Sequence, residues 1–241
     1  MATVADIRTY VVNLPRRRDR RKTIARLLPP DLPVTFTSDW PQTFDGNQLT
    51  RAALKLGGHE LFAWQIDSDN PWWNRPLKLG EIGCTLAHWA CWADAHQHGT
   101  EPYVLVLEDD AVPGPDMLGR LLAGLDTLDG TTFDLLYLGR FPLEADQPAV
   151  PGMVVPGYSH CTFGYLLHRR AIPVLLATDL HQAIVPIDEF LPAMYLDHPR
   201  HDLRERFPRR LTALAFDPPL VTQRPKEEAG SDTEDSPFVD W

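Results

Sequence analysis

Short apolar runs alternate with helical stretches along most of the chain, and this alternation predicts the elements of the fold. Ile7–Leu14 is apolar and β-branched and ends at Pro15, so we expect a strand there, followed by a basic helix through Leu28. Tyr103–Leu107 is a continuous apolar run, which is typical of a strand covered on both faces. Strands that alternate with helices favour an α/β fold with a mainly parallel sheet. Further strands are predicted at Val34–Thr37, Phe133–Leu138, Gly164–Leu167 and Leu211–Phe216.

The longest predicted helix is Gly80–His98, where apolar residues recur at helical spacing and Gly99 provides a stop. Cys84, His88 and Cys91 lie on one face of this helix, four and three residues apart. Two interpretations are open: a zinc triplet, or small residues buried in an apolar setting. Because no fourth ligand lies within sequence reach, we favour the buried interpretation.

Three adjacent acids, Glu108, Asp109 and Asp110, follow the predicted buried strand directly. Ligands in open α/β sheets bind beyond the carboxyl ends of the strands, and adjacent carboxylates there cost free energy unless a cation neutralises them. Glu108 and Asp110 are our candidate metal ligands because alternate residues of an extended turn point the same way. Oxygen ligands favour Mn²⁺ or Mg²⁺ over Zn²⁺. The alternative is a solvated acidic turn in which Asp110 caps the next element.

A basic turn follows the first predicted strand, in the run Asn13 to Lys22. Cations and helix N–H groups placed after a strand bind diphosphates well. The alternative for most of these arginines is a solvated helix face. Taken together, an acidic metal turn and a basic strand-to-helix turn are suited to a metal-bound nucleotide diphosphate.

Composition places the chain among ordinary globular proteins. It has 241 residues, 44% of them hydrophobic, which excludes a disordered or low-complexity protein, and Lys+Arg 23 against Asp+Glu 33 gives a net charge of −10. An acidic chain of this kind lacks the footprint of a non-specific nucleic-acid binder. The three cysteines indicate a reducing compartment, and neither a signal peptide nor an apolar run long enough for a membrane span is apparent, so we expect a cytoplasmic protein.

The acidic charge is concentrated in the segment Pro225–Trp241, which has one lysine against six acids. Such a segment is expected to be solvated and mobile, and to become ordered only on a ligand or metal. Another loop, rich in Pro and Asn, contains Trp64, Trp72 and Trp73. These indoles form either a platform for sugar stacking or pins that hold the loop to the core.

Eight segments in order make the sequence similar to the family-25 glycosyltransferases, which include lipopolysaccharide and collagen hydroxylysine galactosyltransferases. The resemblance covers nearly the whole chain. It implies a GT-A fold, a single Rossmann-like α/β domain with a metal-binding acidic motif, and transfer of galactose or a related hexose from a UDP-sugar. The segments are YVVNLPRRRDRR (Tyr10–Arg21), FDG (Phe44–Gly46), PLKLGEIGCTLAHWACW (Pro76–Trp92), LVLEDDAV (Leu105–Val112), DLLYLG (Asp134–Gly139), GYLLHRRA (Gly164–Ala171), PIDEFL (Pro186–Leu191) and GSDTEDS (Gly230–Ser236).

The resemblance also implies which residues contact the donor. Glu108, Asp109 and Asp110 stand as the acidic motif, with Asp110 as the first candidate to bind Mn²⁺ and the diphosphate. The implied donor-side residues are Asn13, Leu14, Arg16 and Arg20 against uridine or phosphate, Asp45 and Gly46 near the nucleotide, Glu81 and His88 along the donor side, and Ser231 and Asp232 folded over the metal and diphosphate. One departure is Thr222-Gln223-Arg224, where collagen-type members tend to have a histidine, so this segment does not supply a third metal ligand by analogy.

Catalysis in this family implies inversion, by direct attack of an acceptor hydroxyl, and a carboxylate must remove the hydroxyl proton. Asp188 is our candidate base because Pro186 fixes the turn before a predicted helix, and Glu189 is the competing candidate. The alternative is that Asp188 only caps the helix Glu189–Tyr195.

We therefore expect a GT-A domain over residues 1–224, with a donor half at about 1–135 and an acceptor half at about 136–224, and an acidic tail at 225–241. The predicted partners are a UDP-hexose and an acceptor hydroxyl on a lipopolysaccharide-type sugar, another glycan, a small molecule or a hydroxylated peptide. A homo-oligomer stays open. Two other functions remain as alternatives: a metal-dependent phosphohydrolase, or a non-catalytic protein that binds nucleotide sugars.

Overall fold

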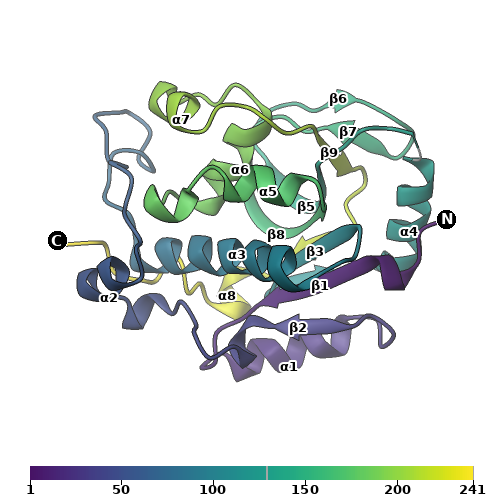
Figure 1. Ribbon diagram of the computed structural model, residues 1–241, viewed down its shortest axis with the longest axis horizontal. Helices are drawn as coiled ribbons and strands as arrows, with labels where there is room; N and C mark the ends of the chain where they lie inside the picture. Colours follow the sequence, from purple (N-terminus) through teal and green to yellow (C-terminus); the bar gives the residue numbers. More distant parts are fainter. Residues whose placement is uncertain (129, 241) are drawn as a thin grey trace.

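The computed structural model describes residues 1–128 and 130–240 of the chain, and a mixed sheet runs through its centre (Figure 1). Within the described residues this sheet has eight strands in the order β2-β1-β3-β8-β5-β9-β7-β6. β8 is antiparallel to β3 and β5, and β7 is antiparallel to β6 and β9, so the other six strands run in one direction. The predicted mainly parallel α/β sheet is confirmed. The strands are β1 (Ile7–Val12), β2 (Val34–Phe36), β3 (Tyr103–Glu108), β5 (Leu135–Pro142), β6 (Gln147–Pro148), β7 (Met153–Val155), β8 (Ser159–His168) and β9 (Ala213–Phe216).

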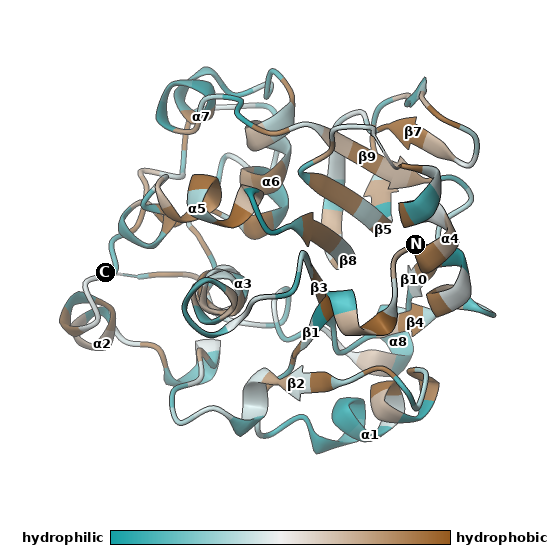
Figure 2. Cartoon of the chain, turned by 45° about the vertical axis from the view of Figure 1, so that its right-hand side comes forward, coloured by the Kyte–Doolittle hydropathy of each residue, from teal (hydrophilic) through white to brown (hydrophobic). Residues whose placement is uncertain are grey.

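Helices cover both faces of the sheet and create two hydrophobic cores. Neighbouring residues of β3 point to opposite cores: Val104 and Val106 pack with α3, α5 and α6, whereas Leu105 and Leu107 pack with α1 and α4. Two-sided burial explains why this strand is a continuous apolar run, and the central strands are hydrophobic along their length (Figure 2). The helices are α1 (Arg18–Leu27), α2 (Arg51–Leu56), α3 (Leu79–His98), α4 (Met117–Thr127), α5 (Ala171–Leu176), α6 (Ile187–Tyr195), α7 (His201–Arg206) and α8 (Lys226–Ala229).

A second, two-stranded sheet connects the acidic turn with the C-terminal part of the chain. β4 (Ala111–Pro113) pairs antiparallel with β10 (Val221–Gln223), so Gln223 lies opposite Ala111. α8 and the tail then continue toward the N-terminus of α3 (Figure 1). In the part of the chain that the structure describes, none of the helices is both long and apolar enough to cross a membrane.

The C-terminal tail is not the solvated segment that its charge predicted, because it packs against the start of α3. The first turn of a helix leaves N–H groups without intrahelical partners. Here the tail supplies acceptors: the N–H of Leu79 donates to the Pro237 carbonyl (2.9 Å), and the N–H of Gly80 donates to Oγ of Ser236 (2.9 Å). The tail therefore belongs to the folded structure, while the predicted division into halves near residue 135 stays a prediction.

Candidate active site

The acidic turn lies at the centre of the sheet, where β3 ends between β1 and β8. Glu108 is the last residue of β3, and Asp109 and Asp110 form the turn into β4. β1 ends beside β3 in parallel register, which brings Asn13 to the same edge. Nδ2 of Asn13 donates to Oδ2 of Asp109 (2.7 Å). The acidic turn and the start of the basic turn therefore lie together, as a shared diphosphate site requires.

Asp109 is the neutralised member of the three acids. Nη1 of Arg20 donates to Oδ1 of Asp109 at 2.8 Å, and both side chains are buried. Burial raises the pKa of Asp109, although Arg20 and the amide of Asn13 oppose that shift. With two donors on its two oxygens, Asp109 holds the basic turn to the acidic turn. Its contacts are those of a structural carboxylate.

Asp110 is buried but poorly supplied with donors. It is 8% exposed, Oδ2 accepts from Nε2 of Gln223 (3.2 Å), and buried Oδ1 has no hydrogen-bond partner among the described residues. Burial, and then the negative charge of Glu108, raises the pKa of Asp110 to about 7, although Arg20, whose Nη1 lies 3.5 Å from Oδ2, opposes the shift. An unpaired carboxylate oxygen beside a second carboxylate fits a hard divalent cation. The alternative of a solvated, capping Asp110 is wrong, because Asp110 is buried and strand β4 follows it.

Glu108 is held from behind by a chain of buried side chains. Nε1 of Trp92 donates to the hydroxyl of Tyr165 (3.0 Å), which lies 2.8 Å from Nδ1 of His88. Because this hydroxyl accepts from the indole, its own proton is available to Nδ1, which leaves the His88 proton on Nε2. Nε2 faces Oε1 of Glu108 at 3.6 Å, and Thr162 donates to the same oxygen (2.6 Å). Burial alone would raise the pKa of Glu108, but these donors lower it.

His88 therefore has a different place from the predicted one. It is fully buried behind Glu108 rather than on the donor side. Of the proposed zinc triplet, Cys91 lies in the hydrophobic core, whereas ligand atoms of Cys84, His88 and Glu108 lie within 4.8 Å of one another. Nε2 of His88 lies 3.6 Å from Glu108 and has no hydrogen-bond partner among the described residues, and the Glu108–Asp110 pair remains our candidate metal site.

A cavity opens in front of the acidic turn, between the end of β1 and the start of α3. Its volume is about 700 Å³ including its open mouth, and Asn13, Leu14 and Arg20 from the basic turn line it together with Glu108 and Asp109. The other lining residues are Val12, Thr37, Trp40, Gln42, Thr43, Phe44, Gly46, Gly80, Gly83, Cys84, Ala87, and Asp232 and Thr233 of the tail.

Glycine is required where α3 approaches the segment that contains Gly46. A Cβ on Gly46 would lie 2.7 Å from the backbone nitrogen of Gly80, and a Cβ on Gly83 would overlap the carbonyl oxygen of Phe44. Close backbone packing therefore forms one wall of the cavity. Asp45 beside it turns away: its carboxylate accepts from Nε of Arg16 (2.7 Å) and from the N–H of Asn47 (3.1 Å).

Glu81 and Ser231, which the resemblance places against the donor, make local hydrogen bonds in this structure, and their contact with the donor stays a prediction. Oε2 of Glu81 accepts from the N–H of Lys78 (2.7 Å) and from Arg75 (3.0 Å), so the side chain caps the start of α3. The hydroxyl of Ser231 accepts from the N–H of Glu234 (3.0 Å) within the tail. Both polar groups are used locally, because helix and turn N–H groups need acceptors.

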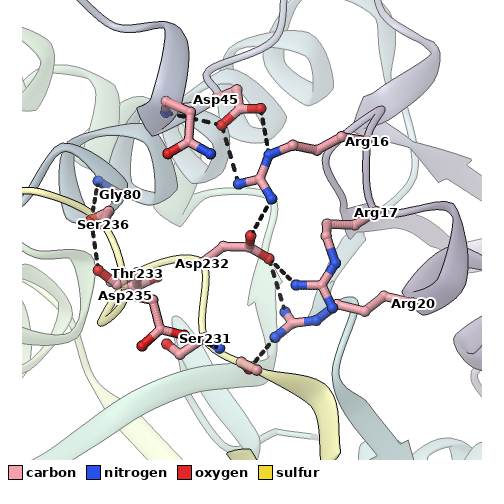
Figure 3. A network of polar contacts seen from close by, with 12 residues as sticks. Arg16, Arg17, Arg20, Asp45, Gly80, Ser231, Asp232, Thr233, Asp235 and Ser236 are labelled. Atoms are coloured by element: carbon pink, nitrogen blue, oxygen red, sulfur yellow. Dashed lines mark hydrogen bonds and ion pairs between the residues drawn. The ribbon is translucent and has the colours of Figure 1, made fainter.

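Three arginines of the basic turn converge on Asp232 of the tail (Figure 3). Nη1 of Arg16 lies 2.5 Å from Oδ1 of Asp232, and Nη1 of Arg17 donates to Oδ2. Arg20 lies 3.7 Å from the same carboxylate and also donates to the carbonyl of Ala229 (3.2 Å). Sequence reasoning selected Arg16 and Arg20 but not Arg17, and in a run of six basic residues nothing in the sequence distinguishes it.

Asp188 and Glu189 lie in the first turn of α6, in strongly different surroundings. Glu189 accepts from Nε1 of Trp73 (3.0 Å) and the hydroxyl of Tyr158 (2.7 Å), and Nε2 of His198 lies 2.7 Å from it. Although burial opposes it, these contacts and His160 hold the pKa of Glu189 far below its usual range. Sequence reasoning missed these donors because they come from three distant segments.

Asp188 has no comparable set of donors among the residues described. Burial raises its pKa to about 6, with His160 opposing the shift and Glu189 supporting it. The pKa of Cys84, which lines the cavity, is raised by burial first, then by Glu108 and by Asp188, so Asp188 lies within electrostatic reach of the donor pocket. Its alternative role as helix cap is wrong, because Pro186 occupies the N-cap position of α6.

The tryptophan loop is fixed by two of its three indoles. Trp64 is buried, its Nε1 donates to the carbonyl of Trp72 (3.1 Å), and the guanidinium of Arg200 lies 4.3 Å from its ring. Trp73 is bound to Glu189, while Trp72 is 43% exposed. The pinning interpretation therefore applies to Trp64 and Trp73, and Trp72 alone is available to a ligand.

Comparison with known proteins identifies the class. Residues 6–129 match the family described as Glycosyltransferase family 25 (LPS biosynthesis protein). The chain is 33% identical over 239 residues to human "Inactive glycosyltransferase 25 family member 3", with 94% of this chain and 39% of that protein covered. It is 32% identical to human "Procollagen galactosyltransferase 2", with 88% of this chain and 34% of that protein covered. The chain belongs to glycosyltransferase family 25, and it spans about two fifths or less of the length of these relatives.

Among solved structures, the chain is similar to a glycosyltransferase involved in the glycosylation of the major capsid of PBCV-1. The TM-score is 0.48 with 11% sequence identity, and the alignment covers 95% of this chain and 98% of that one.

Proposed function

We propose that the protein is a metal-dependent glycosyltransferase that moves a hexose, galactose in the first instance, from a UDP-sugar to a hydroxyl group of a glycan or other hydroxylated acceptor, with inversion. The observation that carries this proposal is the buried carboxylate of Asp110, with one oxygen unpaired among the described residues, beside Glu108, which lines a glycine-walled cavity. The galactosyltransferases among its relatives support the choice of sugar. Because another relative is described as inactive, activity has to be argued from this chain's own residues.

Residues of this chain are available for each part of the donor: the metal, the nucleoside and the diphosphate. Glu108 and Asp110 would hold Mn²⁺ or Mg²⁺, which supplies positive charge for the leaving diphosphate. Asn13 and Leu14 line the cavity for the nucleoside, and Oδ1 of Asn13 is a buried acceptor without a partner among the described residues. Arg20 adds a permanent positive charge at the same edge. Preorganised charge of this kind stabilises a leaving group most strongly where water is excluded.

Asp188 is the base that we assign to the acceptor hydroxyl. A carboxylate with a pKa of about 6 is mostly ionised at pH 7 and remains basic enough to take a proton as the glycosidic bond breaks. Glu189 is unsuited to this step because its pKa is strongly lowered and its oxygens are occupied. We assign Glu189 to positioning, because it connects Trp73 of the tryptophan loop to Tyr158.

A thermal-shift screen against UDP-, GDP- and CMP-sugars, with and without Mn²⁺, tests the donor. We expect a rise in Tm with a UDP-hexose and Mn²⁺ together, followed by UDP release when an acceptor is supplied. If no nucleotide sugar raises Tm in the presence of Mn²⁺, the proposal is wrong. Phosphate release from p-nitrophenyl phosphate would instead identify a phosphohydrolase, and binding without UDP release would identify a non-catalytic binding protein.

A further inference from the structure

The arginines of the basic turn and Asp232 of the tail form an arrangement that the proposed function leaves unexplained. We propose that Arg16 and Arg17 form the seat of the donor's diphosphate, and that in the unliganded protein Asp232 occupies this seat as a carboxylate substitute that the donor displaces. This inference rests on the proposed function, because it concerns how a nucleoside diphosphate enters the same cavity. It adds Arg17 to the donor site and assigns the tail a competing role.

The contacts resemble the binding of an anionic ligand rather than a surface ion pair. Each oxygen of Asp232 has its own guanidinium, Arg16 on Oδ1 and Arg17 on Oδ2, and its side chain is only 19% exposed (Figure 3). Guanidinium groups bind carboxylate and phosphate oxygens with the same fork geometry. A diphosphate oxygen would therefore find in Arg16 and Arg17 the same donors that Asp232 now uses.

The position of Asp232 relative to the cavity makes the two anions competitors. Asp232 and Thr233 line the cavity, whereas Arg16 and Arg17 are not part of its described lining. Asp232 therefore stands between the cavity and these two cations. A diphosphate that entered the cavity would meet a carboxylate of its own sign, and would reach the arginines only after that carboxylate had left.

Two anchors flank the segment that has to move. Upstream, the carbonyl groups of Ala229 and Gly230 accept from Arg20, at 3.2 and 2.5 Å. Downstream, Ser236 accepts from the N–H of Gly80. Gly230 has φ of +68°, a backbone conformation that side chains disfavour, so the chain turns at this glycine, two residues before Asp232. Nζ of Lys78 also donates to the Glu234 carbonyl, so rotation of residues 231–233, between Gly230 and Glu234, would release Asp232 without undocking the whole tail.

Binding of UDP and of uridine to the Asp232→Asn variant, measured by calorimetry in EDTA, tests the inference. The asparagine keeps the size of the side chain but removes the competing charge, so UDP should bind about tenfold or more tightly than to the unaltered protein. Uridine has no phosphate and should bind both proteins equally. Asp235→Asn is the matched control: it makes the same charge change in the same tail, at an exposed residue that contacts the Ser231 N–H (3.2 Å), and should leave UDP affinity unchanged.

Arg17→Gln provides the second arm, and here UDP affinity should fall about tenfold while uridine affinity stays the same. The inference is overturned if Asp232→Asn binds UDP no better than the unaltered protein in EDTA, including the case in which neither binds measurably. If UDP nevertheless binds the unaltered protein with Mn²⁺, the proposed function stands and only the competing role of Asp232 is lost. If neither UDP nor a UDP-sugar binds under any of these conditions, the proposed function fails as well.

Discussion

Replacement of Asp110 by asparagine should stabilise the metal-free protein while it abolishes the response to Mn²⁺. The ionised carboxylate is buried beside Glu108 and lacks a partner for Oδ1 in the described structure, so folding has to hold a charge in an unfavourable place. Asparagine has nearly the same shape and no charge. A mutation at a metal ligand usually costs stability only through the lost metal, and here the metal-free protein should gain.

The size of the gain follows from the pKa. The folded-state pKa of Asp110 is about 7 against 3.8 for the unperturbed group, a difference of roughly three units at about 1.4 kcal/mol each. A raised folded pKa means stability that is present at low pH and is lost as the pH rises, here between about 4 and 7. The upper bound is therefore about 4 kcal/mol at pH 8. We expect roughly half of it, because the asparagine still buries a polar amide.

Urea unfolding of both proteins in EDTA at pH 5 and pH 8, repeated with Mn²⁺, measures both effects. The variant should exceed the unaltered protein by about 2 kcal/mol at pH 8 and by clearly less at pH 5. Mn²⁺ at a hundredfold excess over its Kd should add about 2.7 kcal/mol to the unaltered protein and nothing to the variant. Asp116→Asn, the same change at an exposed residue, should alter neither the stability in EDTA nor the response to Mn²⁺. A variant that is less stable in EDTA, or that responds equally to Mn²⁺, would refute the reasoning.

Three further substitutions separate chemistry, positioning and packing. Asp188→Asn should leave UDP-sugar binding intact and lower transfer on the order of a hundredfold, and transfer that survives would place the base elsewhere. In the unaltered protein, transfer should fall as the pH drops below about 6, where Asp188 is protonated. Glu189→Gln should lower the free energy of unfolding by about 2 kcal/mol or more in a denaturant titration, because three donors lose a charged acceptor, and an unchanged stability would contradict this. Gly83→Ala should weaken UDP binding in calorimetry and lower the free energy of unfolding by about 1–3 kcal/mol, because its Cβ would overlap the Phe44 carbonyl. A variant with full UDP affinity would show that the backbone around Gly83 can move to accept a side chain.

The elements of the fold could be predicted from the sequence, but not all of the strand directions. Six predicted strands and the helices after the first strand and before Gly99 appear within a few residues of their expected bounds. β8 is as apolar as β3, yet it runs the opposite way. A strand buried on both faces has the same pattern in either direction, because burial depends on the covering helices. β6 and β7 are short and mostly exposed, so they lack the pattern that strand prediction needs.

The residue types of the site were predictable where they follow a predicted strand, and not where the site depends on the docking of a distant segment. The acidic turn and Asn13 meet because adjacent parallel strands end at one edge, which the sequence indicates. The docking of the tail depends on free N–H groups at the start of α3, about 150 residues earlier in the chain. Net charge alone suggested a solvated segment, because charge counts do not show where a partner with opposite charge or unsatisfied N–H groups will lie.

The functional carboxylates differ in how many donors surround them, and not in residue type. The oxygens of Asp109 and Glu189 are occupied by donors, which leaves little room for a ligand, and for Glu189 the donors also lower the pKa. Asp110 is buried and Asp188 is half-buried, each next to another acid and with a raised pKa, so a cation in one case and a proton in the other would relieve the cost of desolvation. Each adjacent pair thus contains one carboxylate that holds the structure and one that is available for chemistry. The surroundings thus assign different roles to neighbouring acids, which the residue types at 108–110 and 188–189 do not distinguish.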